Sequence, residues 1–227
     1  MNEYNNFGQV NRISKSDFLT NVFTYLGIGL GLNALGAMVG YYFLPALGNA
    51  YPVVMMILVI VELGCAFMMG RNLEGRSVSA VRMMYTIYSF INGLTLSVII
   101  AVYTTASLLM AFVTATIVFV SLAIIGKTTR FDLSSFGRVF FIGLLVCIIV
   151  STLNLFLFKA TGIEIALCYV ETLLFMGLIA YDMQMIDRYY SQSDNENYAI
   201  FAAFQLELDF INLLLRVLQL FGRRRDD

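Results

Sequence analysis

The chain has 227 residues, of which 59% are hydrophobic and only 13% are charged. Soluble domains are about 45–50% apolar and about 25% charged, so this composition excludes an ordinary soluble protein and is typical of an integral membrane protein. The net charge of −1 argues against a nucleic-acid partner, and the absence of histidine removes the commonest metal ligand and the usual neutral-pH switch.

Three regions follow from the distribution of polar residues. Residues 1–17 form a polar tail without the n-region, apolar core and cleavage site of a signal peptide, so we expect the first apolar segment to be retained. Residues 18–222 are expected to form a single transmembrane domain, and residues 223–227 a charged tail.

Apolar segments long enough to cross a bilayer recur along residues 18–222. A transmembrane helix needs about 20 apolar residues, and no segment alternates with the period of two that a barrel strand requires. Helices are therefore the expected spanning form. We predict an all-α integral membrane protein with seven transmembrane helices, at residues 18–44, 51–70, 78–103, 106–126, 137–158, 163–187 and 197–221.

The lysines and arginines predict the orientation, because positively charged loops stay in the cytoplasm. With seven crossings, the N-terminal side holds nine of the 14 basic residues: Arg12, Lys15, Arg71, Arg76, Arg82, Lys127, Arg130, Arg138 and Arg188. We therefore expect a cytoplasmic N-terminus. Arg223–Arg225 would then lie across the membrane, and a re-entrant last helix is the alternative that would place both termini inside.

The last segment carries one polar stripe on an otherwise apolar helix. Gln205, Asp209, Asn212 and Arg216 stand at i, i+4, i+7 and i+11, which is one helical face. A charged side chain at the bilayer centre costs at least about 2.5–3.5 kcal/mol, so this face should turn toward protein or water. Glu207 lies about 160° around the helix from Asp209 and is expected at the periphery.

The sixth segment carries a matching face with Glu171, Phe175, Leu178 and Asp182. Glu171 and Asp182 are separated by roughly 16 Å along the helix axis. If the two faces meet, a line of carboxylates follows the contact between the last two helices. For Asp209, a structural ion pair with an arginine is an alternative to a functional role.

Three sequence segments resemble the Bax inhibitor-1 family, also called TMBIM or lifeguard, which includes bacterial calcium-leak proteins. They are the end of the sixth segment, IAYDMQMIDRYY (179–190), the stretch TATIVFVSLAIIGKTTRFDLSSFGRVFFIG (114–143), and LDFINLLLRVLQLFG (208–222). The resemblance implies seven helices, the last one central and wrapped by the other six. It also implies a pH-sensitive, calcium-selective leak.

The same resemblance assigns roles to individual residues. It places a gate of two aspartates at Asp182 and Asp209, and an arginine that pairs with the first aspartate at Arg71 or Arg76. Glu62 matches an acidic position of the second helix. We add Glu171, Gln205 and Asn212 to the expected ion pathway from the two polar faces, with Asp182 and Asp209 as the Ca²⁺ ligands.

The leading hypothesis is a passive, proton-gated Ca²⁺ leak in the inner membrane of a bacterial cell, with no enzymatic activity. Ca²⁺ and protons would be its ions, the lipid bilayer its surroundings, and no cofactor is expected. A proton-coupled small-solute transporter and a non-conducting regulatory membrane protein are the alternatives. An intramembrane aspartyl protease is disfavoured, because Asp209 lies in ELDF without flanking glycines and the PAL tripeptide at 45–47 precedes both aspartates.

Overall fold

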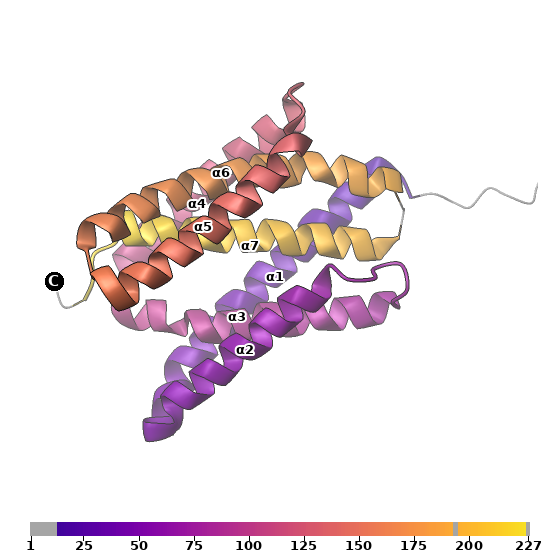
Figure 1. Cartoon of the computed structure of the whole chain (residues 1–227). Helices are drawn as coiled ribbons and strands as arrows, with labels where there is room; N and C mark the ends of the chain where they lie inside the picture. Colours follow the sequence, from indigo (N-terminus) through magenta and orange to yellow (C-terminus); the bar gives the residue numbers. More distant parts are fainter. Residues whose placement is uncertain (1–12, 193–194, 226–227) are drawn as a thin grey trace, which may run out of the picture.

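The computed structural model describes residues 13–192 and 195–225, and its regular structure is helical (Figure 1). Each predicted apolar segment coincides with one helix. Short 3₁₀ turns at Leu44–Ala50 and Leu133–Phe136 and a π turn at Asn154–Phe158 connect or extend the helices. The α-helices are α1 (Lys15–Phe43), α2 (Tyr51–Met69), α3 (Val78–Val102), α4 (Thr105–Thr128), α5 (Gly137–Leu153), α6 (Thr161–Gln192) and α7 (Glu196–Phe221).

Side-chain caps define where several helices begin. Ser14, Ser77, Thr104 and Asn195 each accept a hydrogen bond from a backbone N–H in the first turn of the helix that follows. Such caps satisfy N–H groups that have no partner within the helix. Helix α1 begins at Lys15, three residues before the predicted apolar segment at residues 18–44. Residues 1–12, including Arg12, lie outside the described chain.

Six stretches of the described chain are long and apolar enough to cross a membrane. The first of them, Lys15–Met69, contains both α1 and α2. The connection between these helices contains Pro45 and Gly48, whose φ of 52° breaks the helical backbone. Length and composition thus support an integral membrane protein, while separate crossings by α1 and α2 require a further argument.

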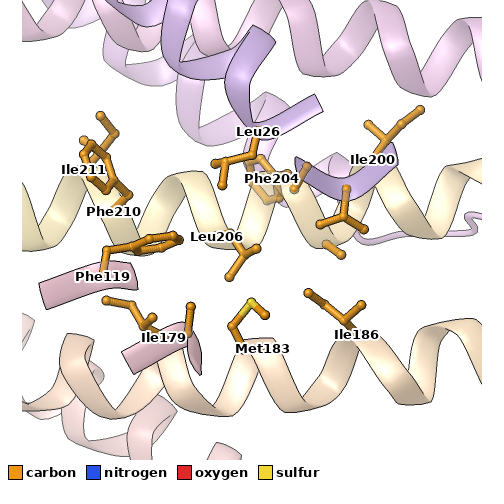
Figure 2. Packing of buried hydrophobic residues seen from close by; sticks show 14 of the residues in the cluster. Leu26, Phe119, Ile179, Met183, Ile186, Ile200, Phe204, Leu206, Phe210 and Ile211 are labelled. Atoms are coloured by element: carbon orange, nitrogen blue, oxygen red, sulfur yellow. The ribbon is translucent and has the colours of Figure 1, made fainter. Parts of the chain in front are cut away.

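Helix α7 is flanked by other helices along its length. It packs against α6, α1, α4 and α3, whereas α2 packs on α3 and α5 packs on α6 (Figure 1). Figure 2 shows Leu206 of α7 facing Met183 of α6, with Leu26 of α1 on the opposite side of α7. The outer helices instead leave large apolar side chains exposed, among them Leu63 of α2 and Ile148 of α5. Such side chains suit contact with lipid.

Glycines allow α1 and α3 to approach closely. A Cβ on Gly36 would come closer than 3.0 Å to the carbonyl oxygen of Phe90, and a Cβ on Gly93 would meet the carbonyl oxygen of Asn33 in the same way. Small residues at a membrane helix contact let the backbones pack directly. Gly31, on the same helix as Gly36, has open space where its Cβ would be.

This contact predicts different effects for two identical substitutions in α1. Gly36→Ala should lower the free energy of unfolding by about 1–3 kcal/mol relative to Gly31→Ala, because the added methyl group overpacks a backbone contact. Both substitutions gain the same helix propensity, which therefore cancels in the comparison. Unfolding in detergent micelles measures the difference, and equal stability of the two variants would contradict the close contact.

Candidate functional site

A cavity of about 400 Å³ lies between α5, α6 and α7. Both polar faces identified in the sequence line it. Leu144 and Ile148 of α5 form its apolar side, and Leu208 adds to the α7 wall. The remaining lining residues are Glu171, Phe175, Leu178 and Asp182 of α6 with Gln205, Asp209, Asn212 and Arg216 of α7.

One end of the cavity holds the two aspartates. The buried carboxyl groups of Asp182 and Asp209 are neighbours there, and the residues are 6% and 4% exposed. Among the described residues, Asp209 Oδ2 is buried and receives no hydrogen bond from a donor. Neither carboxylate forms an ion pair with a described lysine or arginine.

A short chain of hydrogen bonds links two polar side chains to Asp182. Gln205 Nε2 lies 3.5 Å from Asp182 Oδ1, a long hydrogen bond. The amide of Gln205 is itself oriented, because the hydroxyl of Tyr189 donates to Gln205 Oε1 at 2.7 Å. Sequence reasoning did not select Tyr189, which follows Asp182 by seven residues and therefore lies on the same face of α6.

The opposite end of the cavity holds an ion pair. Arg216 Nη1 lies 2.8 Å from Glu171 Oε2 and also donates to Gln219 Oε1 at 2.7 Å. Arg216 Nε is buried without an acceptor in the described part of the chain. The arginine that could have neutralised Asp209 therefore pairs with Glu171 instead. The cavity thus places an acidic pair at one end and an acid–base pair at the other.

The other predicted pathway and gate residues lie elsewhere. Glu62 accepts hydrogen bonds from Asn92 Nδ2 at 2.6 Å and Thr95 Oγ1 at 2.9 Å, so it serves the α2–α3 contact. Arg71 stacks on the ring of Phe67. Arg76 donates to the carbonyl oxygen of Met68 at 2.9 Å and contacts Met84 Sδ. In this structure these three residues are not part of the lining of the cavity.

The expectation that Glu207 lies at the periphery is wrong. Glu207 is completely buried, because the face of α7 opposite Asp209 packs against α1 and α3. Its carboxylate accepts hydrogen bonds from Asn33 Nδ2 at 2.6 Å and Ser89 Oγ at 3.0 Å. The hydroxyl of Tyr85 lies beside this carboxylate and donates to the carbonyl oxygen of Tyr25 at 3.1 Å. The angular separation from Asp209 was correct, but α7 is buried on both faces.

The loop within residues 114–143 docks on the C-terminal half of α6. Gln184, two residues after Asp182, accepts from the backbone N–H of Leu133 at 2.7 Å and donates to the carbonyl oxygen of Phe131 at 2.9 Å. Asp132, outside the spanning helices, accepts from Ser134 and forms an ion pair with Arg188 at 3.1 Å. Hydrogen bonds from Ser134, followed by the charge of Arg188, lower the pKa of Asp132.

The donor set of the cavity suits a loosely held hard cation. Among the described residues, no group of three or more cysteine, aspartate or glutamate side chains is arranged to hold a metal ion. Ca²⁺ takes six to eight oxygen ligands. Asp182 and Asp209, with the amide oxygen of Asn212, supply fewer than that. A Ca²⁺ ion here would therefore keep part of its water shell.

Comparison with known proteins identifies the family. The family described as "Inhibitor of apoptosis-promoting Bax1", the Bax inhibitor-1 family, matches residues 15–226. The inner membrane protein YbhL of Escherichia coli K12 is 36% identical over 174 residues, covering 74% of each chain. An uncharacterized membrane protein of Streptococcus pyogenes serotype M1 is 31% identical over 219 residues, covering 93% of this chain and 94% of that one. A protein of Borreliella burgdorferi is 31% identical over 220 residues, covering 94% of each. The chain is therefore an integral membrane protein of the Bax inhibitor-1 family.

Proposed function

We propose that the protein is a passive, pH-sensitive leak for Ca²⁺, gated by Asp182 and Asp209. The observation that carries this proposal is that two buried, neighbouring carboxyl groups line one end of the α6–α7 cavity, without a basic partner among the described residues. Two adjacent carboxylates repel each other when both are ionised, so one retains a proton and the two titrate as a unit.

A proton shared by the two aspartates would complete their hydrogen bonding. Asp209 Oδ2 has no donor in the described chain, and a proton held between the two carboxyl groups would satisfy it. In that state the pair bridges α6 and α7 and closes the cavity. Loss of the proton leaves two negative charges that repel each other and attract a divalent cation. The pair therefore responds to pH although the chain contains no histidine.

Carboxylates and amide oxygens determine the class of ion. The cavity offers oxygen ligands from Asp182, Asp209 and Asn212 and no thiol, which favours a hard cation such as Ca²⁺. No nucleotide is needed, since the ion moves down its gradient. The proposal places this activity in the inner membrane of a bacterial cell, by the likeness to YbhL.

We further propose that all seven helices cross the membrane and that α7 is the central one. Helix α1 has 29 residues and α2 has 19, which suffices for two crossings at 1.5 Å per residue. The turn at Leu44–Ala50 then lies at the surface opposite Lys15. Burial along α7 and its contacts with α1, α3, α4 and α6 support the central position.

Replacing either gate aspartate should remove the pH dependence of Ca²⁺ flux. In proteoliposomes with an internal Ca²⁺ dye, flux through the wild type should rise as pH increases, because the shared proton is lost. Asp182→Asn and Asp209→Asn keep the size of the side chain but cannot ionise, so each flux profile should be flat. The level of the flat profile can differ between the two variants, since asparagine can still form a bridge.

The matched control is Asp17→Asn, which alters an exposed aspartate at the start of α1 and should retain the wild-type profile. Wild-type pH profiles in both gate variants would contradict the gate. Liposomes that stay Ca²⁺-tight at every pH, but accumulate another solute when given a proton gradient, would establish the transporter alternative. The absence of both activities would favour a non-conducting regulatory protein.

The seven-crossing topology predicts that the two ends of the described chain are on opposite sides. In a variant with Cys65, Cys147 and Cys168 replaced by alanine, a membrane-impermeant maleimide should label Arg225→Cys from outside intact cells. Lys15→Cys should be labelled only after the cells are opened. Labelling of both positions only in opened cells would show that the last helix is re-entrant.

A further inference from the structure

The ion pair between Glu171 and Arg216 lies at one end of the cavity. Glu171 lies ten residues from the start of α6, about 15 Å along the axis, and Arg216 lies five residues before the end of α7. The pair is therefore inside the bundle, at the end opposite the aspartates. Asp209 and Arg216 are seven residues apart, which is about 10 Å.

Two features distinguish this pair from an ordinary surface salt bridge. The Glu171 side chain is 9% exposed and that of Arg216 is 27% exposed, so the charges attract in a medium that screens them poorly. The guanidinium also carries a buried Nε without an acceptor in the described chain. The guanidinium is therefore held through Nη1, while its Nε has no hydrogen-bond acceptor in the described chain.

Arg216 has a second partner in the direction of the surface. Its Nη1 already donates to Gln219 Oε1 at 2.7 Å, and Gln219 is exposed one turn closer to the end of α7. A long arginine side chain near a helix end can extend toward the interface and keep its charge in water. Release of Glu171 would therefore leave Arg216 with a polar partner and free a carboxylate inside the cavity.

Resting on the proposed function, we propose that Glu171 and Arg216 form a second, charge-operated gate at the far end of the Ca²⁺ pathway. While they are paired, the guanidinium repels an approaching cation and occupies the only carboxylate at that end among the cavity-lining residues. When they separate, Arg216 turns toward Gln219 and Glu171 becomes an oxygen ligand for the passing ion. The gate thus sets the cation barrier independently of the aspartates.

The two members of the gate should have opposite effects on flux. Arg216→Gln removes the repelling charge and leaves Glu171, so Ca²⁺ entry into proteoliposomes at fixed pH should rise by about tenfold. Glu171→Gln leaves the guanidinium charge uncompensated, and flux should fall by about tenfold. The exchanged pair, Glu171→Arg with Arg216→Glu, restores an ion pair and should return flux toward the wild-type rate.

The matched controls are the same two substitutions at exposed positions, one on α6 and one in the segment after α7. Glu164→Gln on α6 and Arg224→Gln beyond α7 should leave flux unchanged. A monodisperse elution profile for each variant establishes that it is folded. A purely structural ion pair predicts that both single variants lose flux to a similar extent, and this result would overturn the gate.

The outcome also separates this inference from the proposed function. If the wild type conducts Ca²⁺ and both single variants conduct at the wild-type rate, the second gate is wrong and the leak stands. If the wild type is tight while Arg216→Gln leaks, the gate is supported. If every protein is tight at every pH, the leak and the gate are both wrong.

Discussion

Burial of carboxyl groups within a bilayer-spanning bundle is the constraint on which the arrangement of α6 and α7 depends. Glu171, Asp182, Glu207 and Asp209 are each at most 7% exposed. An isolated charge at such a depth is costly, so each group requires donors, a cation or a proton. The way in which each requirement is met distinguishes the carboxyl groups that hold the fold from those that can respond to an ion.

The two faces of α7 meet this requirement differently. Glu207 is contacted by Asn33, Ser89 and Tyr85, and a Cβ on Gly29 would collide with both Glu207 and Tyr85. This face is tightly packed and saturated with donors, so we regard Glu207 as part of the α1–α3–α7 contact. The opposite face borders a cavity and leaves Asp209 Oδ2 without a donor. Among the sites discussed, only this face combines a cavity with a buried carboxyl oxygen that lacks a hydrogen bond. We therefore expect a response to protons or cations on this face.

Connections outside the cavity anchor the helices that carry it. Asp187, five residues beyond Asp182 on α6, forms ion pairs with Lys15 of α1 and Lys127 of α4 at 2.8 and 2.6 Å. Asn197 at the start of α7 donates to the carbonyl oxygens of Leu73 and Arg76. Asp187 thus holds the ends of α1, α4 and α6 together, and Asn197 holds the start of α7 to the connection between α2 and α3.

Helix positions and both polar faces of the site were predictable from sequence, whereas the partners of the charges were not. Long apolar segments bounded by Ser77, Thr104 and Asn195 specify helices because caps and hydrophobic length are local properties. The spacing of Gln205, Asp209, Asn212 and Arg216 predicts a shared face for the same reason, and all four line the cavity.

Partners depend on how helices pack, which no local pattern encodes. Arg216 had two acidic candidates, Asp209 on its own helix and Glu171 on α6, and only the packing of α6 on α7 selects Glu171. Glu207 was misplaced because the sequence gives its angle around α7 but not the presence of α1 and α3 on that side. The partners of Glu62 likewise depend on the α2–α3 contact, which brings Asn92 and Thr95 to its carboxylate.

The most direct test of the central claim is to detect the shared proton itself. Infrared spectroscopy of the protein in lipid, recorded while pH is raised, reports the carbonyl stretch of protonated carboxyl groups. The account predicts a band that disappears with rising pH in the wild type and is missing from that titration in both Asp182→Asn and Asp209→Asn. A titrating band that persists unchanged in both variants would show that the proton resides elsewhere and would contradict the aspartate gate.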